Sequence, residues 1–102
     1  TLASHYAPRA RVRLYADAAA LAAALAPLPA GAGVAVYCRS PLAVPGAAVQ
    51  RRMPADAASA AQELYAALRE LDANGVAEIW VEQPPESPEW EGVRDRLRRA
   101  AH

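Results

Sequence analysis

The chain reads Gly33-Val34-Ala35-Val36-Tyr37-Cys38 at positions 33–38, and this nearly continuous apolar run decides the fold. A strand that is covered by helices on both faces of a sheet needs apolar side chains on both faces. We therefore expect residues 33–38 to form the central strand of a sheet that lies between two layers of helices.

The segments before this strand predict a linker, a strand and a helix. Residues 1–10 contain no convincing period, and Pro8 biases the residue before it toward an extended conformation. Residues 1–10 are therefore predicted to be a linker, and residues 11–102 a folded domain. Polar and apolar residues alternate over 11–15, as in a half-covered strand. Asp17 is a suitable N-cap for a helix over 18–26, which Pro27 and Pro29 would end.

The segments after the central strand predict a short strand and a long helix. A strand over 48–53 would lie at an edge of the sheet, because Arg51 and Arg52 are typical of an exposed strand. A helix is clearest over 57–73, where Asp56 can cap its start and Asn74-Gly75 its end. Its apolar stripe comprises Ala57, Ala60, Ala61, Leu64, Ala67, Leu68 and Leu71, and its polar residues Gln62, Glu63, Arg69 and Glu70 are expected to face away.

A strand over 78–82 and a last helix from Pro88 to about Ala101 complete the expected elements. Acidic residues stand in the first turn of that helix and arginines toward its end, as the helix dipole favours. The order β-α-β-β-α-β-α predicts an α/β fold. We expect a small Rossmann-like three-layer domain, with about four mostly parallel strands and helices on both faces.

Composition excludes several classes of function. Eleven basic residues balance eleven acidic ones among the 102, which removes the electrostatic attraction of a strong, independent nucleic-acid binder. Cys38 is the only cysteine, so no internal disulfide or cysteine-based zinc cluster is possible, and a reducing, cytoplasmic setting is expected. No apolar run approaches the ~20 residues that span a bilayer. Because the chain opens at Thr1, we expect it to be cut from something longer.

The glycines do not favour a dinucleotide site. Such a site needs a glycine-rich turn between a strand and the following helix, but Gly31 and Gly33 precede a strand instead. In an open α/β sheet, ligands bind beyond the carboxyl ends of the strands. A ligand crevice, if present, is expected near Asp17, Arg39, Ser40 and Gln83.

Other reactive side chains stand alone in the sequence. His5 has only His102 for company, so no metal site is expected, and Cys38 is more typical of a buried thiol than of a nucleophile. Trp90 fits either the margin of the core or a partner-facing patch. Four arginines, Arg94, Arg96, Arg98 and Arg99, could touch tRNA phosphates, but a solvated helix end explains them more simply.

The first residues carry a more specific signal. His5-Tyr6-Ala7-Pro8 resembles the motif in the linker that follows the YrdC-like catalytic domain of two-domain threonylcarbamoyl-adenylate synthases. Later segments also look like the C-terminal domain of that family, namely Met53-Pro54, residues 63–72, Gly75-Val76 and Pro84-Pro85. The resemblance thus covers nearly the whole chain.

This resemblance implies a parent enzyme that converts ATP, L-threonine and bicarbonate to threonylcarbamoyl-adenylate and pyrophosphate for tRNA modification. It implies that ATP and Mg²⁺ are bound by the YrdC-like domain of the same polypeptide, with no cofactor and no catalytic residue in this domain. His5, Tyr6 and Pro8 would belong to a linker that gates the active site of the catalytic domain. Other proteins of the tRNA-modification pathway are further partners that the resemblance suggests.

Two functions stay open at this stage. One is an accessory domain that carries the gating linker; the other is an independent small-ligand or nucleotide-binding module on a Rossmann-like sheet. An enzyme in its own right would need a clustered acid, base and nucleophile, which the sequence does not offer.

Overall fold

The computed structural model describes residues 7–44 and 49–101. Within them the chain forms strands β1 (Arg11–Tyr15), β2 (Val34–Cys38), β3 (Val49–Arg52) and β4 (Glu78–Glu82). The helices are α1 (Ala18–Leu25), α2 (Ala57–Asp72) and α3 (Glu91–Ala100), and a short 3-10 helix, Pro88–Trp90, leads into α3.

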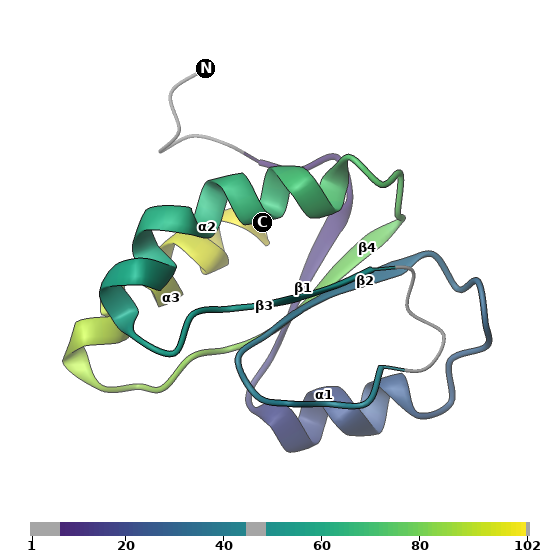
Figure 1. The fold of residues 1–102 in the computed structure, drawn as a ribbon, viewed down its shortest axis with the longest axis horizontal. Coiled ribbons are helices and arrows are strands. Elements are labelled where there is room, and N and C mark those ends of the chain that lie inside the picture. The colour runs from purple at the N-terminus through teal and green to yellow at the C-terminus, as the bar shows by residue number, and fades with distance from the viewer. Residues whose placement is uncertain (1–6, 45–48, 102) are drawn as a thin grey trace.

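All four described strands are parallel and follow the order β1-β4-β2-β3. Helix α1 covers one face of this sheet, and α2 and α3 cover the other (Figure 1). The prediction of a small three-layer α/β domain is therefore confirmed, and β3 is the edge strand that its arginines indicated.

The central strand β2 contributes to both hydrophobic cores, which explains its continuous apolar run. Ala35 and Tyr37 pack into the larger core under α2 and α3. Val34, Val36 and Cys38 pack into the smaller core under α1. Each of these five side chains is at most 4% exposed, so neither face of β2 could carry a polar residue without a buried partner.

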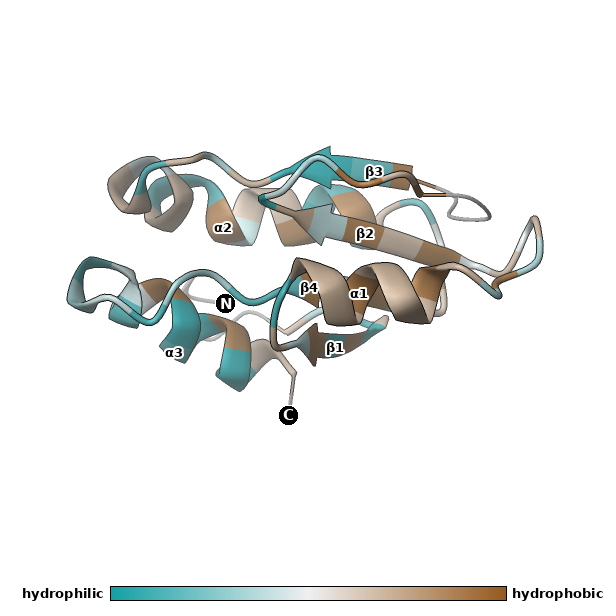
Figure 2. Cartoon of the chain, turned by 90° about the horizontal axis from the view of Figure 1, so that it is seen from below, coloured by the Kyte–Doolittle hydropathy of each residue, from teal (hydrophilic) through white to brown (hydrophobic). Residues whose placement is uncertain are grey.

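The helices differ in the surface that they present to solvent. Helix α1 is built only of alanine and leucine, whereas the outer side of α3 is hydrophilic (Figure 2). The predicted caps are present: Asp17 accepts a hydrogen bond of 2.8 Å from the amide of Ala20, and Asp56 one of 2.9 Å from Ser59. The bond from the Ser59 amide lowers the pKa of Asp56. Gly75 ends α2 with a φ of 73°, as a C-terminal glycine does.

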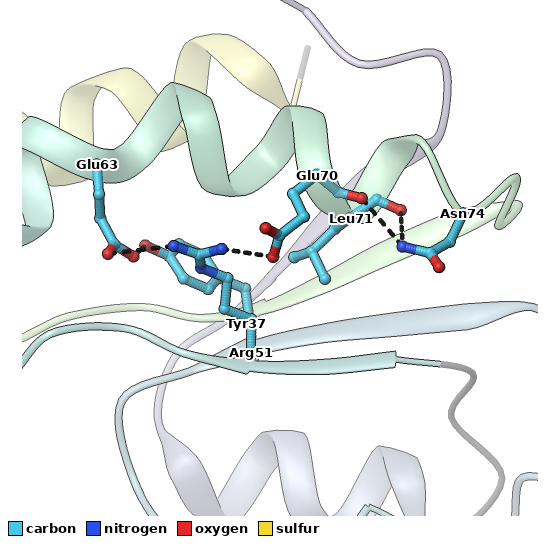
Figure 3. Close-up of polar contacts among 6 residues, drawn as sticks. All are labelled: Tyr37, Arg51, Glu63, Glu70, Leu71 and Asn74. Carbon is cyan, nitrogen blue, oxygen red and sulfur yellow. Dashed lines mark hydrogen bonds and ion pairs between the residues drawn. The ribbon is translucent and has the colours of Figure 1, made fainter.

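One expected orientation is wrong. Glu63 does not face away from the sheet, because its carboxylate accepts a hydrogen bond of 2.9 Å from the buried Tyr37 hydroxyl and lies 3.4 Å from the Arg51 guanidinium (Figure 3). Glu70 also contacts Arg51, at 2.5 Å. A buried tyrosine hydroxyl needs a hydrogen-bond partner, and α2 lies against both β2 and β3, so Glu63 can supply the acceptor.

Trp90 belongs to the core rather than to a partner-facing patch, since it is 3% exposed. The guanidinium of Arg39 lies 5.2 Å from the centre of its ring and covers it. Cys38 is likewise buried, where its sulfur accepts a hydrogen bond of 3.4 Å from the side-chain amide of Gln50. Of the two positions that the sequence allowed for Trp90, the core margin or a partner-facing patch, its burial therefore excludes the patch.

Candidate functional site

The root of the predicted linker is held by one carboxylate. Asp72, the last residue of α2, accepts hydrogen bonds of 2.9 Å from the amides of both Arg9 and Ala10, one on each carboxylate oxygen. Ala10 is 6% exposed and packs into the larger core. The next amide, of Arg11, donates to the carbonyl of Ala77 at 3.0 Å. Three consecutive amides therefore attach the end of the linker to the domain.

The position of Asp72 is unfavourable for α2 itself. A helix dipole places partial negative charge at its C-terminus, so a carboxylate in the last turn is repelled. The hydrogen bonds from two amides to this carboxylate offset the repulsion. Sequence reasoning missed Asp72, although an acidic residue at a helix C-terminus, against the dipole, was a usable signal.

The structure describes only part of the motif that resembles the gating linker. Pro8 is half-buried, whereas His5 and Tyr6 lie outside the described residues. A surface groove of about 450 Å³ lies beside the root of the linker. Arg9, Arg69, Asp72, Ala73 and Gly75 line it. The assignment of residues 1–10 to a linker and the gating role of its motif stay predictions.

The four residues of the expected ligand crevice lie at the opposite edge of the sheet, where the strands end. Two of them contact Glu82, whose side chain at the end of β4 is 6% exposed. Its carboxylate accepts hydrogen bonds of 2.8 Å from the amides of Arg39 and Ser40 and from the Ser40 hydroxyl. Asp17 caps α1. These groups have structural partners, and Gln83 lines a cavity.

That cavity is a crevice of about 140 Å³ beyond the ends of β1 and β4. Its lining residues are Ala16, Gln83, Pro84, Glu86, Arg94 and Arg98. We call this set the carboxyl-end crevice. Gln83 was predicted from the sequence to lie at such a crevice, whereas Arg94 and Arg98 were recognised only as members of an arginine run. The two arginines meet Gln83 because of the way α3 returns along β1, which the sequence does not reveal. That a ligand binds here stays a prediction.

The described residues contain neither a metal-binding cluster nor a membrane-spanning helix. No group of three or more histidine, cysteine, aspartate or glutamate side chains among residues 7–44 and 49–101 could hold a metal ion. No helix in the same ranges is both long and apolar enough to cross a bilayer.

Comparison with known proteins agrees with the resemblance of the linker motif and of the later segments. No curated protein and no solved structure was found to match the chain. One protein family, described as "Threonylcarbamoyl-AMP synthase, C-terminal domain", matches residues 1–102. The match includes both the predicted linker and the folded part with its Asp72 anchor. The chain therefore belongs to the family of C-terminal domains of threonylcarbamoyl-AMP synthase.

Proposed function

We propose that this chain is the accessory domain of an L-threonylcarbamoyladenylate synthase and that its folded part fixes the root of a linker that gates the active site. The catalytic partner is a YrdC-like domain of the same polypeptide, which uses ATP and Mg²⁺ in a cytoplasmic enzyme of tRNA modification. Family membership supports the role in threonylcarbamoyl-AMP synthesis. The hydrogen bonds from Arg9 and Ala10 to Asp72 carry the proposal for the linker.

The physical argument concerns the direction of the chain. Two hydrogen bonds from consecutive amides to one carboxylate fix the peptide planes at Arg9 and Ala10. The chain then leaves the domain in one direction rather than in many, which lowers the entropy that closing the gate would cost. His5 and Tyr6 could thereby be presented to the catalytic cleft, where an imidazole and an aromatic ring would exclude water and hold a closed state.

The test is substitution of Asp72 in the full-length synthase. Asp72→Ala removes both hydrogen bonds, and Asp72→Asn keeps one acceptor oxygen, so synthesis of threonylcarbamoyl-adenylate should fall in the order wild type, Asn, Ala. Asp95→Ala is the matched control, because this half-exposed carboxylate contacts only arginines of its own helix among the described residues. Equal activity of Asp72→Ala and wild type would refute the role of the anchor.

A second substitution separates gating from stability. Replacing both His5 and Tyr6 with alanine should lower synthesis by the full-length enzyme and leave the Tm of the 102-residue chain unchanged. Full activity of this double variant would reduce the linker to a tether. A large loss of Tm in the short chain would show that the two side chains pack into this domain instead.

A further inference from the structure

We propose that the carboxyl-end crevice binds a compact oxyanion, a phosphate group, through the guanidinium groups of Arg94 and Arg98. This inference goes beyond the role of the linker and depends on other residues. The root of the linker lies at the amino ends of the strands, and the crevice lies at their carboxyl ends.

The crevice lies where this sheet topology opens. The ends of β1 and β4 are adjacent, and the amide of Gln83 continues their pairing with a hydrogen bond of 2.8 Å to the carbonyl of Tyr15. The chain then leaves β1 for α1 on one face and leaves β4 for α3 on the other (Figure 1). Helices that follow neighbouring parallel strands thus lie on opposite faces of the sheet, which opens a gap beyond the strand ends, and α/β sheets bind ligands in such a gap.

The two arginines reach the crevice from one side of α3. Arg94 and Arg98 are four residues apart, so they lie on the same side of the helix. Side chains on a helix lean toward its N-terminus, and α3 begins at the carboxyl edge of the sheet. Both residues line the crevice, and this lean directs their side chains toward the carboxyl edge of the sheet.

The guanidinium of Arg94 is oriented by neutral groups. Its Nη1 donates to the carbonyls of Pro85 at 2.5 Å and Ser87 at 3.4 Å. Its Nη2 and Nε donate to no described residue, and it forms no ion pair within the described part of the chain. The loop thus fixes the group and leaves its charge and one edge available. A planar, fixed guanidinium matches the geometry of a phosphate oxygen pair.

Arg98 adds positive charge that its ion pair does not balance. Its guanidinium lies 3.4 Å from the carboxylate of Asp95, which also pairs with Arg99 at 3.0 Å, so two arginines share one negative charge. Glu86 lines the crevice as well. The lining therefore contains two arginines and one glutamate, which gives it a net charge of +1. The side-chain amide of Gln83 adds a neutral hydrogen-bond donor.

Size and charge define the class of ligand. The crevice of about 140 Å³ is smaller than the roughly 300–1,000 Å³ of pockets that enclose drug-sized molecules. It can therefore hold one phosphate group but cannot enclose a whole nucleotide. The chain has a net charge of zero, so it lacks the general attraction that a polyanion such as a nucleic-acid strand would need. The shared chemistry is a single phosphate, either free or at the end of a small molecule.

The experiment is a titration of the 102-residue chain with inorganic phosphate, pyrophosphate and AMP. Binding is monitored by the NMR signals of the Gln83 side-chain amide and of the arginine Nε groups. We expect saturable shifts at Gln83, Arg94 and Arg98. Equal affinities for AMP and phosphate would show that only the phosphate group is recognised, and tighter AMP binding would identify a nucleotide as the source.

Substitutions make the titration decisive. Arg98→Gln should weaken phosphate binding at least tenfold, and it removes no bond to the loop. Arg94→Gln should weaken phosphate binding by the same factor. Because Arg94 also donates hydrogen bonds to the carbonyls of Pro85 and Ser87, the urea midpoint of this variant is measured to separate lost binding from lost stability. Arg96→Gln removes the same charge from α3 outside the crevice and should change the affinity less than twofold. Absence of saturation, or equal losses in Arg96→Gln and Arg98→Gln, would overturn the proposal.

Discussion

The hydroxyl of Tyr37 donates a hydrogen bond of 2.9 Å to the carboxylate of Glu63, which joins the central strand to α2 (Figure 3). Burial, followed by this hydrogen bond, raises the pKa of Tyr37 above its ordinary value. Above a pH of about 10 the unfolded chain loses this proton while the folded chain keeps it. The unfolded state then binds fewer protons, so the free energy of unfolding decreases as pH rises.

The Tyr37→Phe variant should therefore be affected by alkali less than the wild type. At pH 7 it should lose about 0.5–1.5 kcal/mol, the net value of one hydrogen bond. Between pH 9 and pH 11 its urea midpoint should fall less steeply, because phenylalanine has no proton to lose. Tyr15→Phe is the control, since the Tyr15 ring contacts Trp80 and its hydroxyl bonds to no described residue. Parallel alkaline profiles of Tyr37→Phe and wild type would contradict this assignment.

The apolar stripe of α2 predicts that truncating one of its buried leucines lowers the free energy of unfolding substantially. Leu68 is 0% exposed, and its replacement by alanine should cost about 2–5 kcal/mol of unfolding free energy. Urea denaturation of the 102-residue chain measures it, with Ala66→Ser on the exposed side of the same helix as the control. Two equally small changes would mean that α2 does not pack as described.

The buried carboxylate of Glu82 should be essential to the loop after β2. Glu82→Ala would leave the amides of Arg39 and Ser40 without acceptors, at a cost of about 1–3 kcal/mol for each group that stays buried. Ser40→Ala removes only the hydroxyl bond and should cost about 1 kcal/mol. Hydrogen exchange of the two amides gives the local readout. Unchanged protection in Glu82→Ala would show that other groups hold this loop.

The isolated chain should neither hydrolyse ATP nor consume threonine. Phosphoryl and nucleotidyl chemistry requires a phosphate cradle beside a metal-binding carboxylate, and the sequence contains no motif for one. Pyrophosphate or phosphate release is the measurement. Activity that copurifies with the chain and disappears on substitution of one of its residues would contradict the accessory role.

Periodicity predicted the elements of the fold because each buried face repeats along its own helix or strand. It failed for Glu63, whose orientation depends on a tyrosine hydroxyl that lies 26 positions away in the sequence. The candidate site likewise has one part that local sequence predicts and one part that depends on contacts between distant segments. Strand ends placed Gln83 at the crevice, but the convergence of Arg94 and Arg98 depends on the path of α3. Glu82 was missed because its three donors come from another strand's end.

Strand β1 begins directly after the anchored residue Ala10 and ends directly before Ala16, which lines the carboxyl-end crevice. Five residues, about 16 Å of extended backbone, thus form a direct covalent connection between the two sites. Among the described strands, β1 pairs with β4 alone, so it is hydrogen-bonded on one side. A lengthwise shift of this strand would alter both ends together. Any allosteric coupling through it would be reciprocal: a phosphate that favoured the anchored linker would itself bind more tightly when the linker is anchored.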